Sequence, residues 1–329
     1  MRYLVTTYAD RLPTDAPLIM VDGTVPGWMP KLGDRHYDHH HPGGADIQID
    51  EMPLPHEAIA PNTCFVTTMV DADACCAAAW MQLSPQDLTE ETISRLRAIA
   101  WDCDHLSVPD SLNHYAEFAA KAVATLKHDG QSVATEMGLP SNKKEWTLDQ
   151  SEAYASEAFR RGTEWLIAAA KGDRPYPGTQ GEADHYWEAI ANDAQWLLKT
   201  QRVYLVDVKG DKIGLCDIQG VDSSIDPRSF YQALAQLSPL DALRPETLTV
   251  REHRLGGRQY TLGTIPLHPK HKEIDYTRTV FHTLSLAERA YKSDADPWGG
   301  RRTVGGSAWN QPSLLSPTEV IKIVTESDH

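Results

Sequence analysis

Short runs of apolar residues, bounded by Asp, Gly or Pro, mark the beginning of the chain. They lie at Tyr3–Thr7, Leu18–Val21 and Cys64–Val70, and each is rich in Leu or β-branched residues. Runs of this length between turn-forming residues are typical of buried strands. The pattern therefore predicts three strands in the N-terminal part of the chain.

A helical pattern follows between residues 89 and 200. Apolar residues recur there three or four positions apart, as at Ile93 and Leu96. Two longer helices are predicted at Ser151–Lys171 and Ala183–Thr200, and the turn-forming sequence GDRPYPGTQG separates them. We expect the second of these helices to link two domains.

The pattern returns to strands after this helix. Val203–Val208 and Ile213–Ile218 flank a Gly- and Asp-containing turn, and Arg251–Leu255 and Gln259–Leu262 flank a Gly-Gly turn. Apolar runs joined in this way predict two hairpins. An amphipathic helix is predicted at Tyr276–Tyr291, and the chain then becomes glycine-rich.

These elements predict an α/β protein of two domains. Residues 1–182 are expected to form a doubly wound, mostly parallel sheet with a helical segment. Residues 183–329 are expected to form the linker helix and a smaller C-terminal α/β domain. A chain of 329 residues is long enough for two domains of roughly 100–200 residues each. We expect the active site in the cleft between them.

The charge of the chain narrows the classes of partner. Lys and Arg number 31 against 46 Asp and Glu, so the net charge is −15. Such a chain repels a phosphate backbone, because non-specific affinity for nucleic acid comes largely from Lys and Arg. A small phosphorylated substrate is favoured, and an exonuclease with a local basic groove is left open.

Other features of the composition predict a cytoplasmic protein without a membrane partner. No apolar run approaches the roughly 18–20 residues that span a bilayer, and the N-terminus lacks the pattern of a signal peptide. The cysteine count, five, is odd, and Cys75 and Cys76 adjoin each other among alanines. We expect five free thiols. A homodimer is left open.

Acids and histidines gather at four places in the first domain. They are Asp22; Asp38 with His39, His40 and His41; Asp71 with Asp73; and Asp102 with Asp104. The last pair ends a predicted helix, and the others are expected at strand ends. Each place also has a structural explanation: a turn, a solvated histidine cluster, a helix N-cap and a solvated helix end, in that order.

Taken together, these residues predict a metal centre. Loops at the carboxyl ends of neighbouring parallel strands converge on one crevice, which would bring the four places together. Carboxylates and imidazoles suit Mn²⁺, with Mg²⁺, Fe²⁺ and Zn²⁺ as alternatives. Aspartates that bridge two ions are what a two-metal hydrolytic site needs. We therefore expect two ions.

These motifs resemble those of the DHH phosphoesterases. RHYDHHHPGG resembles their DHH signature, LIMVDGT their strand-end aspartate, VDADACCAAAW their DxD motif and RAIAWDCDHL their later aspartate motif. The resemblance covers most of residues 18–106. It departs in order, since the DxD motif here follows DHHH, as in a permuted, uncharacterised DHH-like group. It also departs at Met69, where the family often has a histidine.

The resemblance implies roles for individual residues. It implies that Asp38 and His40 are catalytic, His40 acting beside the phosphate. The metal ligands that it implies are Asp22, Asp38, His39, Asp71, Asp73, Asp102 and Asp104. The family's second domain binds substrate through a glycine-rich loop with basic residues, for which the sequence GGRRTVGGS is similar. The substrate-binding residues would then be Arg301, Arg302, Gly305 and Gly306, although a structural turn explains this loop equally well.

The expected function is metal-dependent hydrolysis of a phosphoester or phosphoanhydride bond, in a nucleotide or another small phosphorylated compound. Water activated by two ions would attack the phosphorus. Two alternatives stay open. One is a metal- or nucleotide-binding protein whose catalytic site has decayed, which Met69 favours. The other is a metal-dependent amidohydrolase, which uses similar ligands without arginines facing the metal.

Overall fold

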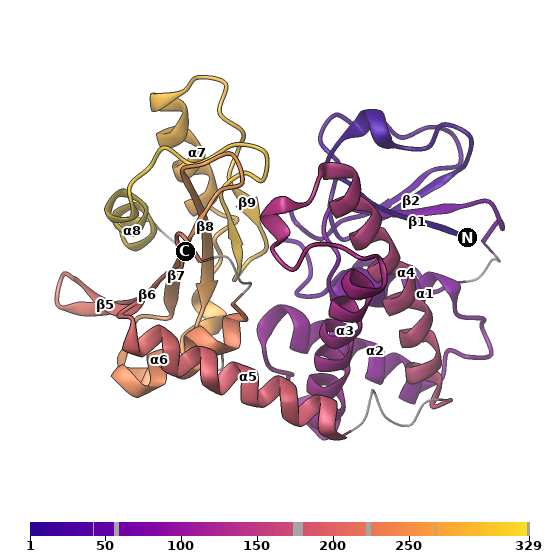
Figure 1. Cartoon of the computed structure of the whole chain (residues 1–329), viewed down its shortest axis with the longest axis horizontal. Coiled ribbons are helices and arrows are strands. Elements are labelled where there is room, and N and C mark those ends of the chain that lie inside the picture. Colours follow the sequence, from indigo (N-terminus) through magenta and orange to yellow (C-terminus); the bar gives the residue numbers. More distant parts are fainter. Residues whose placement is uncertain (42, 56–58, 174–179, 222–224, 267, 328–329) are drawn as a thin grey trace. The chain divides into compact units, whose positions relative to one another are not determined.

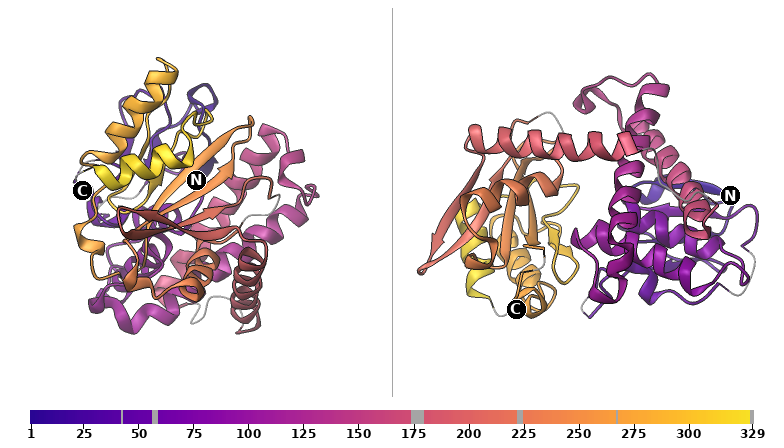
Figure 2. Two further views of the ribbon diagram at one scale, coloured as in Figure 1. Left: turned by 90° about the vertical axis from the view of Figure 1, so that its left-hand side faces the viewer. Right: turned by 90° about the horizontal axis from the view of Figure 1, so that it is seen from below.

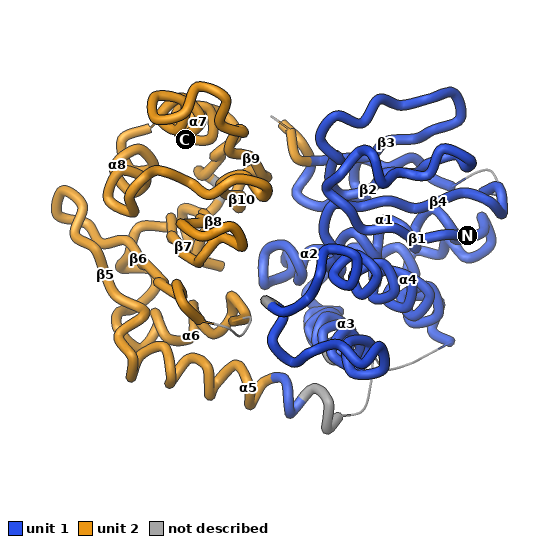
Figure 3. Tube along the Cα trace, turned by 45° about the horizontal axis from the view of Figure 1, so that its top comes forward, with its two compact units in different colours: residues 1–39, 45–186 blue, residues 40–44, 187–329 orange. Residues whose placement is uncertain are grey.

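The computed structural model describes residues 1–41, 43–55, 59–173, 180–221, 225–266 and 268–327. Contacts within the chain define two compact units (Figure 3). The first unit holds residues 1–39 and 45–186, and the second holds residues 40–44 and 187–329. The division into domains at residues 1–182 and 183–329 stays a prediction.

The first unit contains a parallel sheet of four strands in the order β1-β4-β2-β3. The strands are β1 (Arg2–Val5), β2 (Leu18–Val21), β3 (Arg35–Tyr37) and β4 (Cys64–Thr67). The three predicted strands are confirmed, with shorter C-terminal ends for β1 and β4. The edge strand β3 was not predicted, because its sequence Arg-His-Tyr contains no apolar run.

The α-helices of this unit that pack on the sheet share one face of it (Figures 1 and 3). They are α1 (Ala72–Gln82), α2 (Glu90–His105), α3 (Ala116–Glu136) and α4 (Leu148–Lys171). The opposite face, with Leu18, Met20 and Val66, packs against loop residues such as Leu12 and Trp28. The parallel α/β class is confirmed, but the doubly wound arrangement is not found among the described residues. The β1–β2 and β2–β3 connections contain no α-helix, since Pro, Gly and Asp interrupt them.

Helix α1 is buried around almost its whole circumference, which its run of Ala and Cys permits. Its neighbour α4 approaches so closely that a Cβ atom on Gly162 would lie 2.9 Å from the Cys75 Sγ atom. Burial raises the pKa values of the Cys75 and Cys76 thiols, so both behave as small apolar side chains. All five cysteines are free thiols, as expected.

The second unit contains a mixed sheet of six strands in the order β5-β6-β7-β8-β10-β9, drawn from salmon red (β5) to yellow (β9) in Figure 2. The strands are β5 (Val203–Val208), β6 (Asp211–Asp217), β7 (Glu246–Glu252), β8 (Arg258–Thr264), β9 (Gly299–Gly300) and β10 (Gly305–Gly306). Both predicted hairpins are present, but β7 begins and ends earlier than the strand predicted at Arg251–Leu255, since residues 253–257 form the turn. Among the described strand pairs of this second sheet, β6–β7 is parallel and the others are antiparallel.

Helices cover both faces of this second sheet. Helices α7 (Val280–Tyr291) and α8 (Pro317–Glu326) pack in one apolar cluster with residues such as Leu215 and Leu262. Helix α6 (Pro227–Leu237) packs in another cluster with the end of α5 (Gln180–Lys199). The predicted helix at residues 276–291 is therefore confirmed from residue 280 onward.

The remaining helical segments are short 3₁₀ helices. They are η1 (Ala9–Arg11), η2 (Gln48–Glu51), η3 (Asp110–Tyr115), η4 (Lys143–Glu145), η5 (Leu240–Ala242) and η6 (His271–Glu273). Within the described ranges, we find no helix that combines the length and apolar character required to cross a bilayer.

Candidate metal centre

Two neighbouring strands deliver carboxylates to the same edge of the first sheet. β2 and β4 are paired in parallel, and Asp22 follows β2 while Asp71 and Asp73 follow β4. Asp22 has a φ of 51°, a left-handed conformation that is uncommon outside glycine. The Thr67 hydroxyl donates to the Asp22 carbonyl at 3.3 Å and ties the two strand ends together.

Asp71 and Asp73 occupy different positions at the start of α1. Asp71 is the N-cap, and its side chain accepts a hydrogen bond from the Ala74 N–H at 2.9 Å. Asp73, in the first turn, is completely buried. Its Oδ2 accepts from the Gln48 N–H at 2.9 Å, while its Oδ1 has no hydrogen-bond partner within the described residues. The N-cap explanation therefore accounts for Asp71 but not for Asp73.

His39 lies between two of these carboxylates and is also buried. Its Nδ1 atom is 3.1 Å from the Ala45 carbonyl oxygen. A carbonyl only accepts hydrogen bonds, so Nδ1 carries a proton. Nε2 lies 3.0 Å from Asp22 Oδ1 and 3.7 Å from Asp73 Oδ2. Nε2 and the two carboxylates need a positive charge among them, either a second ring proton or a metal ion.

Potential ligand atoms form three groups whose members all lie within 4.8 Å of one another. The groups are Asp22, His39 and His40; His39, Asp73 and Asp104; and Asp71, Cys103 and Asp104. His39 belongs to the first two groups, and Asp104 belongs to the last two. The groups thus form one continuous set that draws on β2, the segment after β3, α1 and the C-terminal end of α2.

Two expected ligands, Asp38 and Asp102, do not belong to these groups. The Thr24 hydroxyl donates to Asp38 Oδ2, and the His36 Nε2 atom lies 3.9 Å from the same oxygen. Asp102 is buried on α2 beside Cys103. Asp104, two residues later, does belong to two of the groups. Helical spacing explains why Asp102 does not, because residues two apart on a helix do not share a face. A catalytic role for Asp38 stays a prediction.

Cys103 was not expected among the potential ligands, because no zinc-type cysteine spacing is present. Burial and the nearby carboxylates of Asp71 and Asp104 raise the pKa of its thiol well above the usual value. A signal did exist, since Cys103 lies between Asp102 and Asp104 in the expected motif. Met69, by contrast, has a side chain that is 45% exposed, so it does not fill a buried ligand position.

The glycine-rich stretch in the second unit forms the β9–β10 hairpin. Gly305 and Gly306 pair with Leu262 and Thr261 of β8. A Cβ atom on Gly306 would lie 2.2 Å from the Tyr260 carbonyl oxygen, so close strand packing explains this glycine. The backbones of Arg301 and Arg302 also bond within the unit, to Val304 and Tyr276. Substrate binding by Arg301, Arg302, Gly305 and Gly306 stays a prediction.

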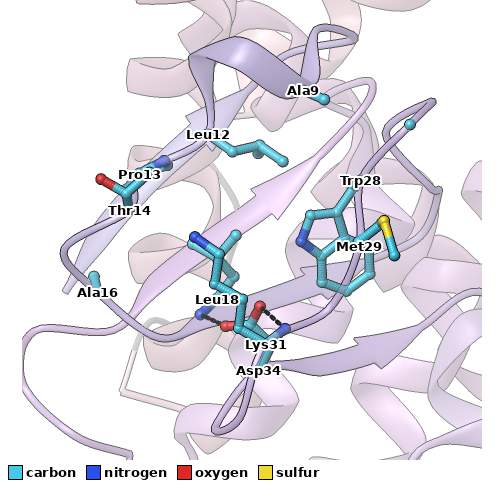
Figure 4. Close-up of a pocket in the computed structure, with 11 residues that line it drawn as sticks. Ala9, Leu12, Pro13, Thr14, Ala16, Leu18, Trp28, Met29, Lys31 and Asp34 are labelled. Atoms are coloured by element: carbon cyan, nitrogen blue, oxygen red, sulfur yellow. Dashed lines mark hydrogen bonds between the residues drawn. The ribbon is translucent and has the colours of Figure 1, made fainter.

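A pocket is present elsewhere in the first unit, near the loop-covered face of the sheet (Figure 4). Its walls include Leu12, Leu18 and Trp28, with Lys31 and Asp34 at one end. The Asp34 carboxylate accepts hydrogen bonds from the backbone N–H groups of Leu18 and Lys31, both at 2.9 Å. The pocket contains none of the predicted site residues.

The sequence matches neither a known family profile nor a curated relative. Among solved structures it is similar to the pGpG-specific phosphodiesterase PggH from Vibrio cholerae, with 9% identity, a TM-score of 0.38, and coverage of 95% of this chain and 100% of that one. It is also similar to a protein from Methanococcus jannaschii described as a family II inorganic pyrophosphatase, with 7% identity, a TM-score of 0.23, and coverage of 98% and 82%. At these TM-scores, neither likeness establishes a shared activity.

Proposed function

We propose that this protein is a metal-dependent hydrolase of a phosphoester or phosphoanhydride bond in a nucleotide or another small phosphorylated compound. The observation that carries the proposal is the environment of His39. Its Nε2 atom lies 3.0 Å from the buried Asp22 carboxylate and 3.7 Å from the buried Asp73 carboxylate, and one carboxylate oxygen of Asp73 is buried without a hydrogen-bond partner in the described structure. Divalent cations bound among these groups would compensate their charge.

The donor set fits two ions. One would be held by His39, Asp73 and Asp104, with Asp22 and His40 beside His39, and the other by Asp71 and Cys103 together with Asp104. Carboxylate and imidazole donors suit Mn²⁺ or Mg²⁺, and a thiolate would favour Fe²⁺ or Zn²⁺ at the second position. When bound, such a pair of ions supplies an activated water and neutralises charge on phosphoryl oxygens.

The residues of this chain keep the ligands in place. The Ala45 carbonyl accepts from His39 Nδ1 and so orients the ring with Nε2 toward Asp22 and Asp73. The N-cap hydrogen bond holds the Asp71 carboxylate at the first turn of α1. In the proposed reaction, Asp38 and His40 act as general acid–base groups beside the phosphate, and Arg301 and Arg302 bind the phosphate oxygens. These four roles rest on the resemblance to the DHH phosphoesterases.

The test combines metal binding with turnover. The purified protein is stripped with a chelator, and its thermal unfolding midpoint is measured with and without Mn²⁺, Fe²⁺, Zn²⁺ and Mg²⁺. Each loaded form is then assayed on bis-p-nitrophenyl phosphate, pyrophosphate and a linear dinucleotide. We expect a metal-dependent rise in the midpoint and hydrolysis of at least one substrate, inhibited by inorganic phosphate.

Other outcomes would replace the proposal. Tight metal binding without turnover across these compounds would favour a binding protein. Hydrolysis of amide substrates without inhibition by phosphate would favour an amidohydrolase. If no divalent cation changes the unfolding midpoint, the proposal of a metal centre is wrong.

A further inference from the structure

Gln48 is a buried polar residue outside all the motifs that suggested the site. It opens η2 and has no exposed surface. Its side-chain Oε1 accepts a hydrogen bond from the His39 N–H at 3.0 Å, and its own N–H donates to Asp73 Oδ2 at 2.9 Å. One residue therefore contacts two of the candidate ligands, which come from different elements.

The buried amide of Gln48 destabilises the fold relative to an apolar side chain of similar size. Its Nε2 atom is buried and has no hydrogen-bond partner among the residues described. A buried donor left unsatisfied costs about 1–3 kcal/mol. A methionine would fill a similar volume without this cost. An amide at this position is therefore explained by its oxygen, which accepts the hydrogen bond from the His39 N–H and fixes the backbone there.

The backbone at His39 matters because its position sets the distance between Nε2 and Asp73 Oδ2. The Ala45 carbonyl fixes the ring at Nδ1, and Gln48 fixes the main chain of the same residue. The Gln48 N–H then fixes the carboxylate on the other side. Groups that hold ligands in this way typically change metal affinity by about 10–100-fold when removed.

We propose that Gln48 is the positioning residue that holds His39 and Asp73 at the distance at which they share a cation. This inference rests on the metal-binding part of the proposed function. It assigns the effect to the carbonyl oxygen of the side chain and not to its volume. A glutamate at this position keeps an acceptor for the His39 N–H, whereas a methionine does not.

The experiment compares Gln48→Met and Gln48→Glu with the parent protein. Each is stripped of metal, its folding is checked by circular dichroism and thermal unfolding, and its affinity for Mn²⁺ is measured by titration calorimetry. We expect Gln48→Met to bind Mn²⁺ at least about tenfold more weakly and Gln48→Glu to stay within about threefold of the parent.

Gln82→Met is the matched control. Gln82 lies at the end of α1 and bonds to the Tyr3 hydroxyl and the Ala78 carbonyl, so its loss removes side-chain hydrogen bonds away from the ligands. We expect lower stability and unchanged Mn²⁺ affinity.

Three results would overturn the inference: parent-like affinity in Gln48→Met, a loss of tenfold or more in Gln48→Glu, or a parent that binds no divalent cation. If Gln48→Met does not fold, Gln48→Leu, which also lacks an acceptor for the His39 N–H, is measured in its place. If the parent protein binds ions but hydrolyses no phosphate compound, the proposed hydrolytic activity is wrong. The comparison of Mn²⁺ affinities still tests the role of Gln48.

Discussion

The cluster around His39 in the first unit and the glycine-rich hairpin in the second unit meet opposite physical demands. In the cluster, Asp22, His39 and Asp73 are buried although charged and polar groups lose hydration there. In the hairpin, glycines replace side chains for which the neighbouring backbone leaves no room. Close backbone packing requires glycine at Gly300, Gly305 and Gly306, whereas the fold does not require the buried carboxylates.

This difference separates residues that serve function from residues that serve packing. Burying a carboxylate costs several kcal/mol unless another charge compensates for it. Several buried carboxylates beside a histidine are therefore candidates for a ligand-binding role. A glycine under a carbonyl oxygen needs no ligand to explain it. The following predictions test the comparison, from the largest expected effect to the smallest.

Asp73→Asn is expected to lower kcat/KM on the hydrolysed compound by at least about a thousandfold, or about 4 kcal/mol. The substitution keeps the acceptor for the Gln48 N–H but removes a buried charge. The metal-free protein should therefore unfold at a higher temperature, by about 2–4 °C for each kcal/mol gained. Steady-state kinetics and thermal unfolding with a chelator check both effects. A metal-free midpoint below that of the parent would contradict the explanation.

His39→Ala is expected to reduce kcat/KM and Mn²⁺ affinity by about a hundredfold, because a ligand is lost from two of the three groups. His41→Ala is the control, since His41 is exposed and belongs to none of the groups. Its activity should stay within about twofold of the parent protein. Equal sensitivity at the two positions would show that burial does not distinguish the histidines.

Gly306→Ala is expected to destabilise the protein by about 1–3 kcal/mol without changing Mn²⁺ affinity. Its Cβ atom would lie 2.2 Å from the Tyr260 carbonyl oxygen. At Gly299, an added Cβ meets nothing within 4 Å, so Gly299→Ala should be nearly neutral. Chemical denaturation of the metal-loaded proteins gives the comparison. Unchanged stability of Gly306→Ala, accompanied by weaker substrate binding, would assign the hairpin to the site.

Replacing Arg301 and Arg302 together by Ala is expected to raise KM about tenfold while bound metal stays unchanged. The hydrogen bonds of both residues to Val304 and Tyr276 are made by the backbone and survive the substitution. Arg302→Lys in place of Ala should recover part of the loss, because an ammonium lacks the planar fork of a guanidinium. The measurement pairs steady-state kinetics with a metal titration. Parent-like kinetics would leave the arginines with no role in substrate binding.

Local patterns in the sequence predict most of the elements around these sites. Apolar runs bounded by turn residues predict β1, β2 and β4, and the Gly-containing turns predict the hairpins of the second unit. The sequence does not predict β3, because its residues are not typical of a strand. Pairing with β2 makes this segment a strand. The helices lie on one sheet face because Pro, Gly and Asp interrupt the β1–β2 and β2–β3 connections, which therefore form loops.

The sequence by itself determines the chemical inventory of the candidate site. Asp22, Asp71 and Asp73 stand out because they follow apolar runs, Asp38 to His41 because four potential ligands adjoin one another, and Asp102 and Asp104 because they end a predicted helix. Tertiary structure decides which side chains meet: it brings Cys103 close to Asp71 and Asp104 and joins Asp38 to Thr24. It also brings Gln48 to the His39 N–H. A hydrogen bond to a buried backbone group depends on how loops from separate elements close in space, and no local spacing encodes that closure.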